Sequence, residues 1–578
     1  MWVIETDSKN CRDCNKCLKE CPVKAIKFEN SVSRIVEERC VLCGNCIRSC
    51  PQGAKKARSY LPEVKGLLAS GETVIASLAP SFAAYFNHYH YQKIIAVLKK
   101  LGFHYVEETA FGAYYTAMAT RYEMQQTPGF WFGSACPSAV NLVERYFPHF
   151  LPHMSRADSP VIAHAKLIKA HYGEDVRVVF ISPCAAKKQE VMEDAVKGLV
   201  DYPLSFLELD EWLADSGIDV NALTDDQDFE RTAPGMGRLF PIRGGILKAA
   251  DLESDYTSFR HLSISGQNNI ISFLEHFKPE EYPDLQFVDL LMCDGGCING
   301  PLGWKELNPI NRVIVTRYQK DKTDKVQPLQ EFPLPELLVR NYRDLKKEYK
   351  QPTDQDIREI LKLIGKLYKE DELNCGGCGY ATCLEKAHAV FHGMAEAEMC
   401  LPFMRKKAES FSNIIVEHTP NGVVLLNREM KILTTNPSFL KLFNLEPGRE
   451  MTGRSIKSIM TDIAPFLKAD SLKSLVEEKI YIEVSKRWVR LVAYPMIDER
   501  MVVGLFHDVT KEEAQRGELD TIRKEIAEHT HDVILKQMRV AQEIAGLLGE
   551  TTAETKAMLS KLVKVLTIDE HRPDQEGF

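Results

Sequence analysis

Strand-like apolar runs alternate with amphipathic helical stretches from about residue 66 to residue 345. The strand-like runs include TVIASLAP, VRVVFIS and FVDLLMC, and the helical stretches include YQKIIAVLKKLGF and AHAKLIKAHYG. This alternation is typical of an α/β domain with a largely parallel sheet. Open sheets of this class bind ligands beyond the carboxyl ends of their strands. We therefore expect the functional side chains of this region to follow the strand-like runs.

The pattern changes on both sides of this region. Residues 1–58 contain two cysteine runs and little else, and the charged stretch 336–372 is predicted to be helical. From about 410 to 510, short strand patterns such as GVVLLN, WVRLVAYP and MVVGLFHDV surround helical ones. This arrangement predicts a small α+β domain.

The remaining residues, 511–578, have a helical pattern with apolar side chains at seven-residue spacing. The members of this stripe are Leu519, Ile526, Val533, Val540 and Leu547. Such a stripe predicts a coiled coil or a helix packed on a partner, and a helix that covers its own α+β domain is an equal alternative. We expect Gly549 to end this helix and residues 552–566 to form another.

Length and charge narrow the class of protein. A chain of 578 residues is long enough for roughly three to five domains. The net charge of −8 is spread without long runs of like charge, so nothing indicates nucleic-acid binding. No stretch approaches the roughly 18 uninterrupted apolar residues of a membrane span, and the polar start MWVIETDSKN does not resemble a secretory signal. We expect a cytoplasmic protein.

Sixteen cysteines are clustered at two- and three-residue gaps. In a long chain without an export signal, this spacing favours soft metal ions over disulfides. The first eight form two CxxCxxCxxxCP runs, in which the fourth cysteine of each run serves the other cluster. The predicted ligand sets are Cys11, Cys14, Cys17 and Cys50 for one 4Fe–4S cluster, and Cys40, Cys43, Cys46 and Cys21 for the other. Zinc is the alternative, and the doubled run argues against it.

Four further cysteines lie in three loops of the central region: SACP at 134–137, SPCAAKKQE at 182–190 and MCDGGCING at 292–300. Without their contexts, Cys136 and Cys184 would be interpreted as buried apolar residues. In this order the loops resemble the signature loops of the FeFe hydrogenases, TSCCPxW, MPCxxKxxE and ExMxCxxGCxxGGGQP. The resemblance covers roughly residues 1–400.

The resemblance implies an H-cluster, in which a 4Fe–4S cubane is joined to a diiron subcluster with CO, cyanide and azadithiolate. The implied cubane ligands are Cys136, Cys184, Cys293 and Cys297. Cys297 would be shared with the diiron subcluster, and Lys187 would donate to an iron-bound cyanide. The alternative for Lys187 is a solvated surface lysine. Such a cofactor performs the hydrogen chemistry, while the protein supplies few bonds.

Several positions depart from the pattern of catalytic members. Ala135 stands where those members have the proton-relay thiol, and alanine cannot transfer a proton. Glu190 matches a relay carboxylate of the family, and without the thiol it is expected to form only a salt bridge. The other active-site positions of interest are Ser182 in place of methionine, Pro183, Asp289, Leu291 and the shortened Gly300-Pro301. The pattern resembles the sensory branch of the family.

A last cysteine group, CGGCGYATC followed by Cys400, resembles the small four-iron domain CGxCGYxxC…C of electron-transfer proteins. The residues between, LEKAHAVFHGMAEAEM, are predicted to form one helix that returns the last cysteine. Zinc is again the alternative. The predicted ligands of this third 4Fe–4S cluster are Cys375, Cys378, Cys383 and Cys400.

The region from EHTPNGV through NPSF to HDVT resembles a PAS domain, a fold that binds small ligands or serves as a dimerising relay. His418 or His507 could bind haem, although solvated histidines are the commoner case. His529 and His531 invite a histidine-kinase interpretation, but no ATP-binding domain follows them.

These inferences predict a multidomain α+β and α/β protein. The predicted domains are a two-cluster ferredoxin domain (1–58), an H-cluster domain (66–345), a further 4Fe–4S domain (352–402), a PAS domain (408–511) and a helical output or dimerisation segment (512–578). We expect a slow, hydrogen-sensing hydrogenase that forms a homodimer and acts on a kinase or phosphatase. The alternatives are a catalytic hydrogenase that exchanges electrons with ferredoxin, and an iron–sulfur assembly protein of the prelamin-recognition type without a diiron site.

Overall fold

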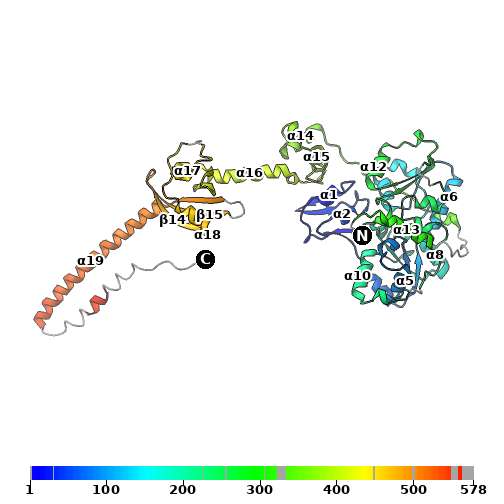
Figure 1. The fold of residues 1–578 in the computed structure, drawn as a ribbon, viewed down its shortest axis with the longest axis horizontal. Helices are drawn as coiled ribbons and strands as arrows, with labels where there is room; N and C mark the ends of the chain where they lie inside the picture. Colours follow the sequence, from blue (N-terminus) through cyan, green and yellow to red (C-terminus); the bar gives the residue numbers. More distant parts are fainter. Residues whose placement is uncertain are drawn as a thin grey trace. The chain divides into compact units, whose positions relative to one another are not determined.

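The computed structural model describes residues 3–29, 31–224, 227–253, 257–304, 306–321, 333–446, 450–496, 501–548 and 557–562. The chain divides into two compact units, Met1–Met404 and Arg405–Phe578 (Figure 1). Among the described residues, no helix is both long and apolar enough to span a bilayer. Gly549 and most of the helix predicted over 552–566 lie outside the described residues. The part of that prediction that the structure describes, residues 557–562, is helical.

The amino-terminal cysteine runs lie on a small fold of two antiparallel strand pairs. The strands are β1 (Ile4–Thr6) with β4 (Lys55–Ala57), and β2 (Ile26–Glu29) with β3 (Val32–Ile35). Each run begins as a loop and ends in a short helix, α1 (Lys16–Lys19) or α2 (Asn45–Ser49). Before α2, Gly44 has a φ of +73°, and a Cβ there would lie 2.4 Å from the Pro301 ring. Only glycine allows this close approach to the central domain.

The central domain contains two parallel sheets. The first has the order β6-β5-β8-β9 and the second has the order β10-β11-β7. Their strands are β5 (Val74–Leu78), β6 (Tyr105–Glu108), β7 (Trp131–Phe132), β8 (Arg177–Ser182), β9 (Tyr202–Ser205), β10 (His261–Ser265) and β11 (Phe287–Leu291). The predicted parallel α/β domain is confirmed, but it is divided between two sheets. Every residue of β5 and β11 is buried, which explains their unbroken apolar runs.

Helices cover these sheets, as the sequence predicts. The principal ones are α5 (Tyr91–Lys100), α6 (Ala110–Gln126), α7 (Pro137–Tyr146), α8 (Pro160–Tyr172), α10 (Phe206–Ser216), α12 (Gln267–His276) and α13 (Ile310–Asp321). Helices α6 and α8 pack closely because Gly112 has no side chain: a Cβ there would lie 2.3 Å from the carbonyl oxygen of Pro160. This packing joins the segment before the first cysteine loop to the segment after it.

The helix predicted over 336–372 is wrong over most of its length. Two short 3₁₀ turns (Leu334–Leu337 and Lys369–Asp371) and α14 (Asp354–Leu363) form, and residues 338–353 run as an irregular strap over the central domain. The strap's backbone bonds to that domain instead of to itself: the amide of Arg340 donates to Arg156 O (3.1 Å) and that of Leu345 to Glu144 O (2.9 Å). These long-range contacts outweigh the local helical preference of a charged segment.

The third cysteine group lies between α14 and the start of a later helix. Helix α15 (Cys383–Phe391) covers only the first half of the helix predicted over 384–399. It ends because Gly393 takes a φ of +65°, and the amides of Gly393 and Met394 bond back to the last helical turn. A 3₁₀ turn, Ala397–Met399, then brings Cys400 back to the group.

The second unit contains a five-stranded antiparallel sheet with the order β13-β12-β16-β15-β14. Its elements are β12 (Gly422–Asn427), β13 (Ile432–Thr435), α17 (Pro437–Leu442), α18 (Ala464–Leu472), β14 (Val476–Ile482), β15 (Arg487–Met496) and β16 (Met501–Asp508). The predicted α+β domain is therefore confirmed. Its core includes Phe439, Phe443, Phe466 and Phe506.

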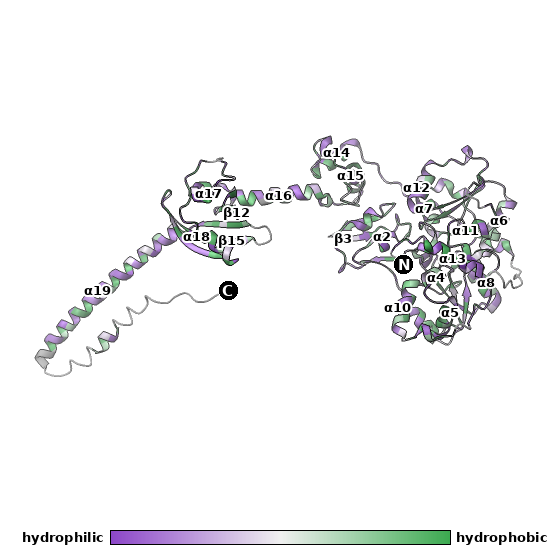
Figure 2. Cartoon of the chain, in the orientation of Figure 1, coloured by the Kyte–Doolittle hydropathy of each residue, from purple (hydrophilic) through white to green (hydrophobic). Residues whose placement is uncertain are grey.

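Two long helices flank this sheet in the sequence: α16 (Leu401–His418) and α19 (Thr510–Leu548). Hydrophobic positions recur at intervals along α19 (Figure 2). The stripe members Leu519, Ile526 and Val533 are 57%, 60% and 56% exposed. The helix therefore does not cover its own α+β domain with this stripe. For the described part of α19, the predicted alternative of a covering helix is wrong.

Candidate functional site

Four cysteines that are far apart in the sequence line one cavity: Cys136, Cys184, Cys293 and Cys297. They follow β7, β8 and β11, at the carboxyl ends of parallel strands, as expected for an open α/β sheet. Cys136 immediately precedes α7, and Cys184 immediately precedes α9 (Ala185–Glu190). A position just before a helix favours the thiolate form of cysteine. Cys43 of the amino-terminal fold borders the same cavity.

The surroundings of these cysteines fit an iron–sulfur cluster. Gly296 has a φ of +106°, and a Cβ there would lie 2.3 Å from Pro241 O. A Cβ on Gly300 would lie 2.5 Å from Pro183 O, so the third loop closes around the cavity only with glycine at both positions. Burial raises the pKa of Cys184 to about 11. A buried thiolate therefore needs a bound cation, and soft sulfur ligands favour iron in clusters.

Lys187 lies beside this cavity and is not a solvated surface lysine. Its side chain is 11% exposed, and its Nζ lies 2.6 Å from Glu190 Oε2, one turn further along α9. Its positive charge lowers the pKa of Cys136, Cys184 and Cys297, although burial keeps all three pKa values above the usual value. The structure thus holds one ammonium group next to the predicted cubane ligands.

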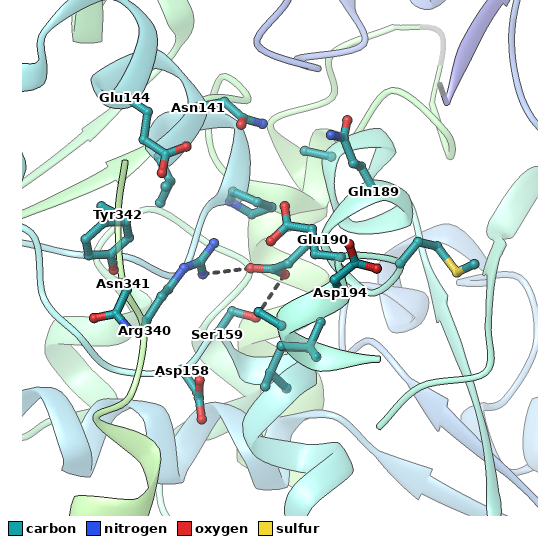
Figure 3. Close-up of a pocket in the computed structure, with 18 of the residues that line it drawn as sticks. Asn141, Glu144, Asp158, Ser159, Gln189, Glu190, Asp194, Arg340, Asn341 and Tyr342 are labelled. Atoms are coloured by element: carbon teal, nitrogen blue, oxygen red, sulfur yellow. Dashed lines mark hydrogen bonds and ion pairs between the residues drawn. The ribbon is translucent and has the colours of Figure 1, made fainter. Parts of the chain in front are cut away.

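Glu190 is buried and fully paired (Figure 3). Besides Lys187, it accepts hydrogen bonds from Ser159 Oγ at 2.9 Å and from Arg340 Nη1 at 2.7 Å. Burial raises the pKa of Glu190, but the charges of Lys187 and Arg340 outweigh it, and the pKa lies below the usual value. A carboxylate held as an anion in this way is a poor proton acceptor, which favours the predicted salt bridge over a relay.

Arg340 is a site residue that the sequence did not predict. It lies on the strap; burial lowers the pKa of its guanidinium, but Glu190, Tyr342 and Glu193 together hold that pKa above its usual value. A second hydrogen bond, to Ser134 O at 3.3 Å, reaches the first cysteine loop. One guanidinium therefore joins the first loop, the second loop and the strap. No local motif marks it, because its partners are about 150 to 200 residues away in sequence.

A cavity of about 1020 Å³ is lined in part by Glu190 (Figure 3). Its lining includes Glu190, Arg340, Glu193 and Asp194. Burial and the charge of Glu190 raise the pKa of Glu193. Titratable groups therefore line this cavity together with Glu190, which is itself paired with Lys187.

The positions that depart from the catalytic pattern are buried. Ala135 is 8% exposed and packs with Phe240 and Phe287 in an apolar cluster. Asp289 accepts a hydrogen bond from Ser263 Oγ at 2.8 Å, and burial raises its pKa to about 6. Ser182 and Leu291 are also buried, and Leu291 lines the cysteine cavity. The position at which catalytic members have the relay thiol is therefore occupied by the methyl group of Ala135 in an apolar environment.

The other cysteine groups are also brought together. Cys21 acts electrostatically on Cys40, Cys43 and Cys46, which matches the predicted crossed set. In the other set, Cys14 acts on Cys17. The third group lines one cavity: Cys375, Cys378, Cys383 and Cys400. The ligand assignments remain predictions that this geometry supports.

The histidines singled out by the sequence lie outside these sites. His507 Nδ1 is 2.7 Å from Asn421 Oδ1, and His418 lies on the exposed helix α16. His529 and His531 lie on α19. The structure brings none of these four together with another among the described residues.

This arrangement defines an iron–sulfur protein with a PAS-type domain. Residues 72–301 match the family of the iron only hydrogenase large subunit, C-terminal domain. Residues 10–54 match a 4Fe-4S dicluster domain, residues 371–402 an Fe-S cluster family and residues 410–481 a PAS domain. The central region of the chain, residues 72–301, is therefore similar to the iron-only, or FeFe, hydrogenase family.

Proteins similar to this chain include two hydrogenases and a nuclear prelamin A recognition factor. Iron hydrogenase 1 of Clostridium pasteurianum is 28% identical over 377 residues, covering 53% of this chain and 65% of that protein. The periplasmic [Fe] hydrogenase large subunit of Nitratidesulfovibrio vulgaris is 30% identical over 282 residues, covering 43% and 66%. The nuclear prelamin A recognition factor of Xenopus laevis is 26% identical over 291 residues, covering 39% and 64%. The chain spans less than two thirds of each relative.

The buried pairing of Arg340 allows a direct stability test. Arg340→Gln should destabilise the first unit by about 3–5 kcal/mol, because it leaves the Glu190 carboxylate with one cation fewer in a buried site. The matched control is Arg343→Gln, three residues along the same strap and exposed, for which a change within about 0.5 kcal/mol is expected. Urea denaturation of the full chain measures both. Equal, small changes would mean that the Arg340–Glu190 pair does not stabilise the domain.

Proposed function

We propose that this protein is a hydrogen-sensing FeFe hydrogenase of low turnover. The observation that carries the proposal is the combination of four convergent cysteines with Ala135, a methyl group in an apolar surrounding where a relay thiol is expected. Binding of the cofactor is supported, whereas rapid proton exchange is not. Such a protein reports hydrogen more effectively than it consumes it.

The residues of the chain have distinct roles in this proposal. The bound H-cluster supplies the chemistry that splits hydrogen. Cys136, Cys184, Cys293 and Cys297 hold it. Lys187, fixed by Glu190, presents its ammonium group to the cofactor. Ala135 offers no proton carrier, and the paired Glu190 resists protonation, so protons are transferred slowly at this face of the site.

Contacts within the first unit support an electron path away from this site. Cys43 borders the active-site cavity, and its own predicted cluster includes Cys21. On the other side, Lys24 Nζ donates to Gly379 O at 3.0 Å, and Leu18 packs against the same glycine. The loop of the third cysteine group therefore lies against the amino-terminal fold. The proposed path runs from the H-cluster through the amino-terminal clusters to the third cluster.

The second unit is suited to a relay. Phenylalanine rings fill its interior. The ring centres of Phe439 and Phe466 lie 5.3 Å and 6.3 Å from the ring centre of Phe506. Dense packing of this kind supports a dimerising relay rather than a ligand-binding PAS domain. The exposed stripe of α19 fits a homodimer. A kinase or phosphatase is the proposed recipient of the signal.

Two other functions are testable alternatives. A catalytic hydrogenase coupled to ferredoxin would show fast turnover in the matured protein. An iron–sulfur assembly protein, suggested by the prelamin-type relative, would lack the diiron subcluster. The doubled cysteine run, the third cysteine group and the PAS domain argue against the assembly role, since each matches a family of its own.

Infrared spectroscopy of the matured, purified protein tests the proposal. Bands of iron-bound CO and cyanide are expected, together with a shift of these bands under hydrogen and a low rate of hydrogen oxidation. Absence of the bands in a protein with full iron content would favour the assembly role. Intense bands with fast turnover would favour the catalytic hydrogenase.

Removal of the second unit separates sensing from output. Deleting 408–578 should leave cluster content and hydrogen reactivity nearly unchanged, because every cysteine precedes residue 401. The truncated chain should lose dimerisation and hydrogen-dependent regulation of the partner. Iron content, infrared spectra and the mass of the particle in solution measure these outcomes. Loss of the active-site bands on truncation would show that the second unit is needed to maintain the active site.

A further inference from the structure

Two lysines are buried beside the predicted electron-transfer clusters. Lys386 on α15 is 1% exposed and Lys55 on β4 is 2% exposed. Within the described residues, neither ammonium group forms an ion pair with a carboxylate. The buried lysines of the second cysteine loop differ, since Lys187 pairs with Glu190 and Lys188 with Glu208.

Lys386 is held at the third cysteine group. It lines the cavity of the four cysteines, and its Nζ donates to Ala397 O at 2.9 Å. The charges of Cys378, Cys400 and Cys383 act on it, and that of Glu398 acts on it less strongly, without an ion pair between these two described side chains. Burying an ammonium group without a counter-charge is costly. A 4Fe–4S cluster with four thiolates supplies that counter-charge, because it is negative in both oxidation states and more negative when reduced.

Lys55 is placed differently. Its Nζ donates to Ser33 O at 3.1 Å and to Thr6 Oγ1. Its charge acts on Cys11 and Cys17 of one predicted set, and on Cys40 and Cys46 of the other. Two cluster sites thus share one buried ammonium group, whereas the third site has Lys386 to itself. One cysteine of the third site, Cys375, is exposed, as is Cys14 of one amino-terminal set, so exposure to water does not distinguish the sites and the buried lysines do.

We propose that Lys386 sets the reduction potential of the third cluster, raising it so that this cluster collects an electron released at the active site. The proposal rests on the hydrogen-sensing function and deepens it. Oxidation of one hydrogen molecule releases two protons and two electrons. One electron lowers the oxidation level of the third cluster by one, and the other electron reduces one of the amino-terminal clusters. The charge of the third cluster then changes beside Cys400, the residue directly before α16, which leads into the second unit.

Redox titration of the full chain, followed by electron paramagnetic resonance, tests this role. The protein is produced without the diiron subcluster, so that the result does not depend on hydrogen chemistry. In Lys386→Met, the reduced-to-oxidised ratio of one cluster at its wild-type midpoint should fall about tenfold, equal to 59 mV for a one-electron couple. Lys386→Arg, which keeps the charge, should leave that midpoint nearly unchanged. Lys55→Met is the matched control. It should shift the midpoints of the amino-terminal clusters instead of that of the third cluster.

The outcomes separate a charge effect from a packing effect. Iron content is measured in each variant, and Lys386→Gln provides a second neutral variant if methionine disturbs the fold. An unshifted midpoint at full iron content would overturn the proposal, and so would equal loss of the cluster in the methionine and arginine variants. Loss of iron in both neutral variants with retention in Lys386→Arg would support it. Failure of hydrogen sensing in the matured wild-type protein would leave the potential shift intact, so the two hypotheses fail separately.

Discussion

Replacing Cys297 by serine is expected to abolish the infrared bands of iron-bound CO and cyanide. Cys297 lines the cavity together with the other three cysteines of the central loops, and it is the thiolate proposed to join the cubane to the diiron subcluster. A serine oxygen is a harder ligand than sulfur and binds iron–sulfur clusters less well. Infrared spectra of the matured variant measure the effect.

The other cysteine groups provide the control for this variant. Their predicted ligands lie in separate segments, at 11–50 and 375–400, so the signals of those clusters should persist in Cys297→Ser. The matched variant is Cys378→Ser, which should impair the third cluster while leaving the CO and cyanide bands at full strength. Full-strength bands in Cys297→Ser would reject its assignment as the bridging ligand.

The sequence predicts those parts of the fold that depend on local pattern. The buried strands β5, β8 and β11 appear as apolar runs of strand length, because both faces of a parallel sheet are covered. The convergence of Cys136 and Cys293 follows from the same topology, since they follow β7 and β11, which pair as parallel strands and bring their carboxyl ends to one edge, whereas Cys184 follows β8 of the other sheet. The five strands of the PAS domain are equally local signals.

The parts that the sequence does not predict depend on distant partners. The strap around Arg340 has the composition of a helix, yet a buried carboxylate 150 residues earlier holds it in an irregular conformation. Lys386 has the pattern of a surface lysine in an amphipathic helix, and only the four surrounding cysteines explain its burial. Division of the strands between two sheets likewise depends on pairing across the chain. Local spacing contains no information on any of these contacts.

Ala135→Cys is expected to increase the rate of hydrogen oxidation or evolution. Proton transfer requires a titratable group within hydrogen-bond reach of the reacting centre, and Ala135 occupies that place with a methyl group. A general acid or base contributes about 10²–10⁴-fold, which sets the upper limit of the gain. A smaller gain is expected, because Ser182, Asp289 and the shortened third loop also differ from catalytic members. Hydrogen electrode or dye-reduction assays on the matured protein measure the rate.

The environment of Ala135 determines which control is informative. Phe240 and Phe287 pack around it, so any larger side chain adds volume to a filled apolar cluster. Ala135→Ser adds a hydroxyl of nearly the same size as the thiol but without a pKa in the working range, and it should not accelerate turnover. A gain in the cysteine variant alone therefore reports proton transfer rather than altered packing. Iron content and infrared intensity show that all three proteins have equal cofactor occupancy.

The outcome distinguishes the proposed sensor from a catalytic enzyme. At equal occupancy, a faster cysteine variant and a slow wild type would mean that the missing thiol limits turnover. An unchanged rate would place the limit at a later step, at Glu190, which lines the cavity of about 1020 Å³ and is held as an anion by Lys187 and Arg340. Combining Ala135→Cys with Arg340→Gln then tests that second step, since loss of the guanidinium raises the proton affinity of Glu190. A wild-type protein that already turns over rapidly would overturn the sensor proposal, because its protons would have to leave without either group.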